Sequence, residues 1–268
     1  MAVIDKLRVF STLFVIAAVS LVLIPVQVVA LKFRWPLSRR LPRFWHRFAC
    51  RTIGFRIRTV GSLDPRRPLM MTANHASWKD ILVLGSLADV AFIAKTEVRD
   101  WPVFGLLARL QRSIFIARED KRATGGQVNE IAARMAEGEV VVLFPEGTTS
   151  DGNRLLPVKS SLFGAASAAL PLAPDGVVYV QPVIIAYVGI HGMPMGRYHR
   201  PIAGWPGEVT LIPHLLRVLE VGALDIEVTF GEPIAFRQGD QRKVLAARVE
   251  SEMRTMLTAS LHPRADRP

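Results

Sequence analysis

The feature that most limits how this chain can fold is an apolar segment near its amino terminus. Residues 9–31 read VFSTLFVIAAVSLVLIPVQVVAL and contain no charged side chain. A helix needs about 20 apolar residues to cross a bilayer, whereas the apolar core of a cleaved signal peptide is usually about 7–15 residues long. We therefore expect this segment to remain in the protein as a membrane-anchoring helix.

The basic residues around this segment predict its orientation. Two precede it, Lys6 and Arg8, and more follow it: Lys32, Arg34, Arg39, Arg40, Arg43, Arg47 and Arg51. By the positive-inside rule, the rest of the chain then faces the cytoplasm from the inner membrane of the cell. Pro25 and Gln27 interrupt the apolar pattern, so a spanning helix and a monotopic hairpin both remain open. Residues 37–55 alternate arginine with leucine and aromatic side chains, which suits the lipid headgroup layer. Residues 1–54 are thus expected to form the anchor.

The overall charge agrees with a membrane surface as the partner. The formal net charge is +11 and half of the residues are hydrophobic. A basic chain usually meets nucleic acid or anionic lipid, and the apolar excess favours lipid. The nucleic-acid alternative lacks basic–aromatic strand motifs and zinc-ligand spacings. Cys50, the only cysteine, indicates a reducing compartment, and we interpret it as a packing residue in preference to a catalytic thiol.

Residues 55–268 show the alternation of short β-rich runs and helical patterns that is typical of an α/β domain. We predict a mixed, largely parallel sheet flanked by helices. The strands are expected at 55–60, 68–73, 90–95, 113–117, 139–144, 177–188 and 225–230, and the helices at 79–87, 103–110, 125–138, 160–170 and 243–257. Proline and glycine cluster at 192–207, which predicts a long surface loop of possible functional importance.

The candidate catalytic residues are His75 and Asp80, which follow the strand expected at 68–73. Side chains five apart diverge on a regular helix, so the two meet only if His75 lies in a loop and Asp80 in a first helical turn, with Ser77 as the helix N-cap. Asp80 would then accept the Nδ1–H of His75 and leave Nε2 as a base. Because no G-x-S-x-G nucleophile motif is present, an α/β hydrolase is disfavoured. The pair must activate water or an alcohol.

Further polar residues follow three other predicted strands. Each of them comes at the carboxyl end of its strand: Lys95, Arg118, Glu146, Gly147 and Thr148. If the strands are parallel, these ends share one edge of the sheet with His75, which is where ligands bind in α/β sheets. Arginine is suited to a phosphate or a carboxylate. No histidine lies at a metal-ligand spacing, so no metal site is expected.

Four short blocks resemble a known family in their order and spacing. They are NHASWKD (74–80), SIFIAR (113–118), FPEGTTS (144–150) and the step Val180-Gln181-Pro182-Val183. Together they are similar to the motifs of the glycerolipid acyltransferases, and most resemble those of the bacterial lysophosphatidic acid (1-acylglycerol-3-phosphate) acyltransferases. The resemblance covers roughly residues 70–230. Ser113 and Gln181 depart from the residues that the family often has there.

The resemblance implies an acyltransferase of phospholipid biosynthesis that converts lysophosphatidic acid to phosphatidic acid. His75 would take the proton from the 2-hydroxyl as it attacks a thioester, and Asp80 would hold the imidazolium. The remaining residues would bind substrate: Arg118 the phosphate, Glu146, Gly147 and Thr148 the glycerol, with Lys95 adding positive charge. The acyl donor would be acyl-CoA or acyl-carrier protein, an acidic partner that a basic surface steers, and no metal or tightly bound cofactor is implied. The alternative acceptor is lyso-ornithine lipid, because the acyltransferases that complete ornithine lipids share the same blocks.

Overall fold

One mixed sheet forms the centre of the molecule in the computed structural model, which describes residues 3–117, 121–207 and 209–262. Across the described residues the strands follow the order β1-β8-β6-β2-β5-β3-β4, while β7 and β9 both pair with β6. The strands are β1 (Arg56–Val60), β2 (Leu69–Ala73), β3 (Val90–Lys95), β4 (Ile114–Ile116), β5 (Val140–Leu143), β6 (Val177–Ile190), β7 (Met193–Pro194), β8 (Leu224–Phe230) and β9 (Ile234–Arg237).

The strands that carry the candidate residues are parallel. β2 pairs in parallel with β5 and β6, and β3 pairs in parallel with β5 and β4. β8 and β9 run antiparallel to β6, so the predicted mixed, largely parallel sheet is confirmed. Every residue of β2 and β5 is buried, as expected for parallel strands that helices cover on both faces.

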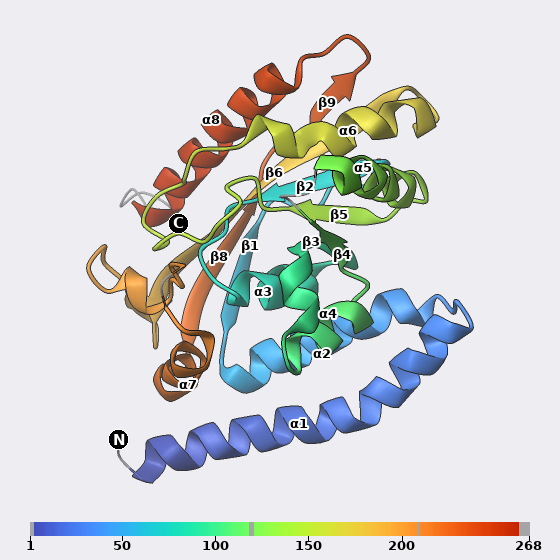
Figure 1. Ribbon diagram of the computed structural model, residues 1–268. Helices are drawn as coiled ribbons and strands as arrows, with labels where there is room; N and C mark the ends of the chain where they lie inside the picture. The colour runs from blue at the N-terminus through green and yellow to red at the C-terminus, as the bar shows by residue number, and fades with distance from the viewer. Residues whose placement is uncertain (1–2, 118–120, 208, 263–268) are drawn as a thin grey trace.

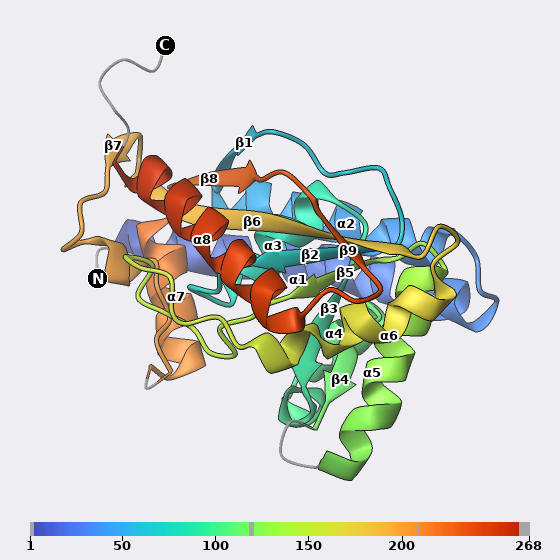
Figure 2. The ribbon, with the colours of Figure 1, turned by 90° about the horizontal axis from the view of Figure 1, so that it is seen from above.

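Helices cover both faces of the sheet (Figure 1). Their bounds are α3 (Lys79–Leu87), α4 (Phe104–Leu110), α5 (Lys121–Ala136), α6 (Gly164–Ala169), α7 (Leu211–Val221) and α8 (Arg242–Leu261). Neighbouring residues of β2 point to opposite faces. Met71 packs in the core beneath α2 (Leu37–Ile53) and α3, and Met70 in the core beneath α5 and α8. Figure 2 shows α8 crossing its face of the sheet obliquely.

The predicted elements are largely confirmed. The helix expected at 160–170 is broken into short turns, Ser160–Phe163 and Leu170–Leu172, on either side of α6. Two elements were not predicted. One is α7, which carries Pro213 in its first turn, where proline is tolerated. The other is β9, a short strand that pairs with the first residues of β6.

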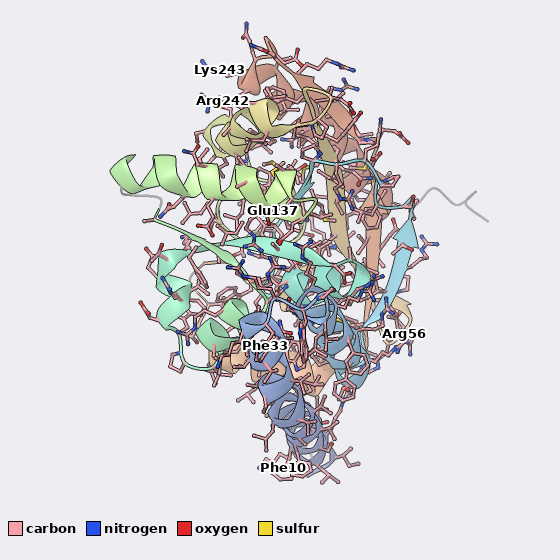
Figure 3. The ribbon with its side chains drawn as sticks, turned by 90° about the vertical axis from the view of Figure 1, so that its right-hand side faces the viewer. Phe10, Phe33, Arg56, Glu137, Arg242 and Lys243 are labelled. Carbon is pink, nitrogen blue, oxygen red and sulfur yellow. The ribbon has the colours of Figure 1, made fainter. Side chains whose placement is uncertain are left out.

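The amino-terminal segment forms α1 (Val3–Lys32), which runs along a flank of the molecule beside α2 (Leu37–Ile53), α4 and α7 (Figure 1). Among the described residues this is the one helix long and apolar enough to cross a membrane, and only 11% of its most apolar stretch is buried. Large apolar side chains therefore remain exposed along it, including Phe10, and Phe33 just after its end is exposed as well (Figure 3). Exposed apolar surface of this extent marks a contact site and suggests a membrane anchor.

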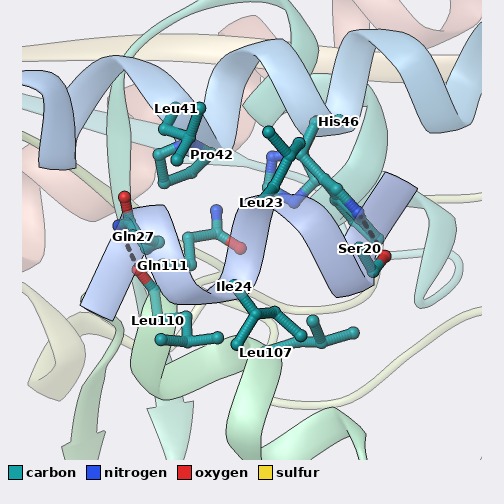
Figure 4. A pocket seen from close by; sticks show the side chains of 11 residues that line it. Ser20, Leu23, Ile24, Gln27, Leu41, Pro42, His46, Leu107, Leu110 and Gln111 are labelled. Carbon is teal, nitrogen blue, oxygen red and sulfur yellow. Dashed lines mark hydrogen bonds between the residues drawn. The ribbon is translucent and has the colours of Figure 1, made fainter. Parts of the chain in front are cut away.

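Gln27 explains how a polar residue fits within this apolar helix. Its Nε2 donates to the carbonyl oxygens of Ser38, at 2.9 Å, and Leu110, at 2.7 Å. Nearby, Trp45 donates its indole N–H to Ser20 Oγ at 2.8 Å. A mainly apolar pocket between α1, α2 and α4 lies beside these bonds (Figure 4). Gln27 is buried and fastens α1 to its neighbours instead of facing lipid.

A close approach joins α2 to the sheet through α3. A Cβ atom added to Gly85 of α3 would lie 2.2 Å from Nδ1 of His46 in α2, so only glycine allows this contact. Burial lowers the pKa of His46 to about 4, which keeps its imidazole neutral. Cys50 of the same helix is buried and its pKa is raised by burial to about 12. Its thiol is therefore a packing group, because reactive thiols need a lowered pKa.

Candidate active site

His75 and Asp80 form a hydrogen-bonded pair at the carboxyl end of β2. His75 lies in the loop after this strand, and Asp80 lies in the first turn of α3. The Nδ1 atom of His75 is 2.9 Å from Oδ2 of Asp80. This is the loop-and-first-turn arrangement that the five-residue spacing requires, so the geometry predicted for the pair is confirmed.

The carboxylate of Asp80 is fully buried and accepts several bonds. Its Oδ2 accepts hydrogen bonds from the backbone N–H groups of Ala76, at 2.7 Å, and Ser77, at 2.8 Å. Its Oδ1 accepts the hydroxyl of Tyr187 at 2.7 Å. A carboxylate whose oxygens accept from all of these donors has no hydrogen of its own to offer, so its bond to His75 is made by an Nδ1–H. Asp80 therefore fixes the tautomer as well as the orientation of the imidazole.

Tyr187 is the residue that sequence reasoning missed. It lies on β6, far from Asp80 along the chain, and is fully buried. Burial and the negative charge of Asp80 raise its pKa above the ordinary value, so the phenol stays neutral and donates. No local spacing connects the two residues, because only the pairing of β6 with β2 brings them together.

The imidazole of His75 is held against a neighbouring strand end. Its ring stacks on Phe144, with ring centroids 4.0 Å apart and planes 17° apart. Its backbone oxygen accepts the N–H of Ser150 at 2.8 Å. The side chain is 18% exposed, and no described residue hydrogen-bonds Nε2. This nitrogen is therefore free to accept a proton from a substrate hydroxyl.

Asn74 fixes the start of the candidate catalytic loop, residues 74–78 between β2 and α3. Its side-chain amide donates to the carbonyl oxygen of Ile185 at 3.1 Å and accepts the N–H of the same residue at 2.7 Å. These two hydrogen bonds to Ile185 extend the pairing of β2 with β6 beyond the last residue of β2, Ala73. The side chain immediately before His75 thus sets where the loop leaves the sheet.

Ser77 is not the N-cap of α3, and that prediction is wrong. The residue before the helix is Trp78, and it makes no side-chain capping bond. The carboxylate of Asp80 satisfies the loop amides itself, and Ser77 Oγ instead accepts a bond from Lys79 at 2.8 Å. The Nζ of Lys79 also donates to the carbonyl oxygen of Ala203 at 2.6 Å. Lys79 is fully buried, and burial lowers its pKa to about 7, opposed by the charge of Asp80.

The predicted surface loop at 192–207 packs on the catalytic loop. The N–H of Trp205 donates to the carbonyl oxygen of Ala76 at 2.7 Å. The buried guanidinium of Arg200 donates to the carbonyl oxygens of Tyr187, at 3.2 Å, and Met195, at 2.8 Å, and to Asn153 Oδ1 at 2.6 Å. The Trp205 bond therefore joins this segment to the catalytic loop, and Arg200 joins it to β6.

Glu146, Gly147 and Thr148 follow β5, the strand beside β2. Gly147 has a φ of 72°, a left-handed conformation that favours glycine. Glu146 is almost completely buried, and neither carboxyl oxygen has a hydrogen-bond partner of normal geometry. Burial raises its pKa to about 8, against the smaller effect of the nearby backbone amides of His75 and Leu156. Glu146 is thus mainly neutral at pH 7 and lies next to the catalytic loop.

The other two predicted binding residues, Lys95 and Arg118, come at or after the ends of strands that lie farther from β2 than β5 does. Lys95 ends β3, which is separated from β2 by β5, a lateral distance of about 10 Å at ordinary strand spacing. Its side chain is exposed and has no ion pair among the described residues. Arg118 lies outside the described residues. Strand β4, which precedes it, is one strand further from β2 than β3 is.

The two departures from the family pattern lie away from His75. Gln181 is buried in the first half of β6 and ties together three segments. Its Oε1 accepts the N–H of Asp64, and its Nε2 donates to the carbonyl oxygens of Ser62 and Gly231, all at 2.9–3.0 Å. It acts as an internal structural residue. Ser113 immediately precedes β4. The described residues contain no group of three or more histidine, cysteine, aspartate or glutamate side chains that could hold a metal ion.

Comparison with known proteins gives a consistent result. A family model described as acyltransferase matches residues 55–186. The lyso-ornithine lipid O-acyltransferase of Rhizobium meliloti (strain 1021) is 57% identical over 98% of this chain and 90% of its own length. The 1-acyl-sn-glycerol-3-phosphate acyltransferase of Neisseria gonorrhoeae is 30% identical over 74% and 73%. The crystal structure of the 1-acyl-sn-glycerophosphate (LPA) acyltransferase PlsC from Thermotoga maritima matches 98% of both chains with a TM-score of 0.66 at 21% identity, a likeness of fold.

Proposed function

The chain belongs to the acyltransferase family and is a lysolipid acyltransferase, and within that class we propose that it acylates lyso-ornithine lipid. One observation carries the choice of acceptor. Identity to a lyso-ornithine lipid O-acyltransferase is 57% across nearly the whole chain, against 30% over three quarters of it for a lysophosphatidic acid acyltransferase. The alternative acceptor of the sequence analysis is therefore better supported than lysophosphatidic acid.

The proposed reaction moves an acyl group from a thioester to a hydroxyl of the lysolipid. The hydroxyl oxygen attacks the thioester carbonyl while His75 Nε2 takes its proton. The tetrahedral intermediate then expels the thiolate, which receives the proton from the imidazolium, so that an ester and a free thiol leave. Asp80 stabilises the imidazolium through the Nδ1 bond at 2.9 Å. General-base catalysis of this kind contributes typically about 10²–10⁴ in rate.

The remaining site residues have proposed roles at the same edge of the sheet. Glu146, Gly147 and Thr148 follow β5, the strand beside β2, which supports a role in shaping the acceptor pocket. Glu146 in its neutral form would offer a proton donor to an acceptor oxygen. Lys95 and Arg118 would supply positive charge farther along this edge. An anionic group of the acceptor or of the thioester donor is the partner that we propose for them.

We further propose that α1 anchors the enzyme and that residues 55–268 form the catalytic unit on the cytoplasmic side of the inner membrane. The exposed apolar side of α1 and the basic residues after it support this orientation. α1 packs on α2, α4 and α7, which favours a helix lying against the catalytic unit within one leaflet. α2 joins the two parts, because its buried residues pack on α3.

A direct comparison of acceptors tests the proposed function. The purified full chain is given lyso-ornithine lipid or lysophosphatidic acid, each with acyl-CoA or acyl-carrier protein, and the acylated lipid is quantified. We expect the higher kcat/KM with lyso-ornithine lipid. Efficient acylation of lysophosphatidic acid together with negligible acylation of lyso-ornithine lipid would show that lysophosphatidic acid is the acceptor instead.

A further inference from the structure

A second pocket lies at the opposite edge of the sheet from His75. It is bordered by the first residues of β3 and β5, the first turns of α2 and the ends of α4 and α5, and its volume is about 320 Å³. Strands β2, β3 and β5 are parallel, so their amino-terminal ends face away from the catalytic edge. This pocket is therefore separate from the proposed acceptor site.

The lining of this pocket is strongly basic. It contains two carboxylates, Asp89 and Glu139, and five arginines: Arg39, Arg40, Arg67, Arg112 and Arg134. Positive charges thus exceed negative charges by three. Guanidinium groups concentrated in a concave site attract an anion and bind phosphate through paired N–H donors.

Glu139 organises part of this cluster. Its buried carboxylate pairs with Arg112 through a short contact, with Arg134 at 2.5 Å and with Arg39 at 3.4 Å. Arg134 also donates to the carbonyl oxygen of Arg112 at 2.7 Å. These bonds hold the guanidinium groups of Arg112 and Arg134 in fixed positions, so little side-chain entropy remains to be lost when a ligand binds.

Two arginines of the lining are not neutralised by this carboxylate. Arg40 is exposed and has no ion pair among the described residues. Arg67 donates only to backbone carbonyl oxygens, those of Asp64 and Arg66 at 2.7 Å and that of Gly138 at 3.3 Å. Asp89 reaches Arg43, outside the lining, at 4.0 Å. The pocket consequently retains positive charge for an added anion.

The approach to the pocket carries features of a membrane interface. Between α1 and α2, the exposed rings of Phe33 and Trp35 stack with centroids 5.8 Å apart. Leu37, also exposed, follows them and leads directly to Arg39 and Arg40. Aromatic residues concentrate at the depth of lipid headgroups, and basic residues at that depth attract anionic lipid. The mouth of the pocket therefore lies where headgroup phosphates are expected.

We propose that this pocket binds a phosphate group, supplied by the headgroup of an anionic phospholipid in the surrounding bilayer. The arginines at its mouth and on its wall contact the phosphate oxygens, and Phe33 and Trp35 lie against the lipid beside it. The site is independent of the acyl acceptor, and it stands whichever lysolipid the enzyme uses.

The test uses the purified full chain in an uncharged detergent and measures binding of short-chain phosphatidylglycerol. Phosphatidylcholine with the same acyl chains, inorganic phosphate and acyl-carrier protein are measured in parallel. The test variants are Arg40→Glu and the milder Arg40→Gln, which leave the pairs of Glu139 intact. The matched control is Arg51→Glu on the same helix, where the arginine is exposed and has no ion pair among the described residues.

We expect Arg40→Glu to weaken phosphatidylglycerol binding by about tenfold to a hundredfold, the loss of one or two charge-assisted hydrogen bonds, and Arg40→Gln by a smaller factor. Arg51→Glu should change it less than about threefold. If inorganic phosphate binding depends on Arg40 and phosphatidylglycerol binding does not, the pocket takes a soluble phosphate, and the lipid part of the proposal is wrong. Equal losses at Arg40 and Arg51 would overturn the proposal, as would a dependence on Arg40 confined to acyl-carrier protein.

Discussion

The hydroxyl of Tyr187 donates to Oδ1 of Asp80 at 2.7 Å, on the oxygen that His75 does not use. Both carboxylate oxygens are therefore engaged, one by β6 and one by the catalytic loop. A carboxylate held at both oxygens cannot rotate, so the direction in which it presents Oδ2 to the imidazole is set by the sheet. The positioning of His75, the proposed base, thus depends on a residue outside every sequence motif.

Replacing Tyr187 with phenylalanine tests this dependence. The ring stays packed, but Oδ1 of buried Asp80 loses its donor, and the imidazole is held less firmly. We expect kcat to fall by about tenfold, the effect of one hydrogen bond to a charged group, with little change in the KM of either substrate. Steady-state kinetics measures both constants. An unchanged kcat would show that the Asp80 carboxylate needs no support from β6.

The negative charge of Asp80 is tested by Asp80→Asn. The amide has almost the same shape, and its oxygen in the Oδ2 position can still accept from Ala76, Ser77 and His75 Nδ1, but the neutral side chain no longer stabilises the imidazolium that forms when His75 takes the substrate proton. We expect turnover to fall by about 10²–10⁴ while the protein remains folded by circular dichroism. A rate near that of the unsubstituted chain would mean that Asp80 only satisfies the amides of Ala76 and Ser77.

Glu146 predicts a pH dependence of stability. Its pKa is about 8 in the folded chain against an ordinary value of 4.5, so the folded state binds more protons than the unfolded state between these pH values. The stabilisation that the protonated Glu146 carboxyl gives to the folded state is fully present below about pH 4.5. It is lost progressively as pH rises to about 8. Glu146→Gln removes this ionisation. Thermal unfolding should therefore show the variant gaining stability over the parent chain from pH 5 to 8, and a constant difference would contradict the buried neutral carboxyl.

Gln27 should be required for the docking of α1. Gln27→Ala leaves the carbonyl oxygens of Ser38 and Leu110 without their donor and enlarges the pocket between α1, α2 and α4. We expect a loss of about 1–3 kcal/mol, seen as an apparent Tm lower by roughly 2–4 °C per kcal/mol in detergent. Gln27→Glu, which cannot donate from its ionised form, should be at least as damaging. Equal thermal stability in all three chains would show that these bonds do not hold α1.

The exposed side of α1 predicts which substitutions release the protein from membranes. Phe14 and Leu21 are 63% and 76% exposed, and charged residues at membrane depth are costly. The double substitution Phe14→Glu with Leu21→Glu should move the chain from the membrane fraction to the soluble fraction. The matched control places glutamate at Val244 and Leu172, 64% and 51% exposed on other helices. Release by both double variants alike would argue against a lipid contact specific to α1.

Sequence patterns predicted the fold and the position of the catalytic pair because these depend on local signals. Runs of apolar residues marked the buried strands, and the spacing of His75 and Asp80 allowed one arrangement of loop and helix. The contact of Tyr187 with Asp80 was not predictable, since it arises from the register of β6 against β2. The capping role assigned to Ser77 failed because the carboxylate of Asp80 takes the amides that a cap would serve. The basic pocket is lined by six separate stretches of the chain, and no single stretch reveals it.

The rate of acyl transfer to lyso-ornithine lipid by the full chain, compared with that of His75→Ala, tests the central claim most directly. The structure leaves His75 Nε2 as the free nitrogen of a histidine whose other nitrogen is engaged by Asp80. We predict rapid transfer by the unsubstituted chain and a loss of at least about 10² in the folded, membrane-bound variant. Comparable rates for the two proteins would contradict the account.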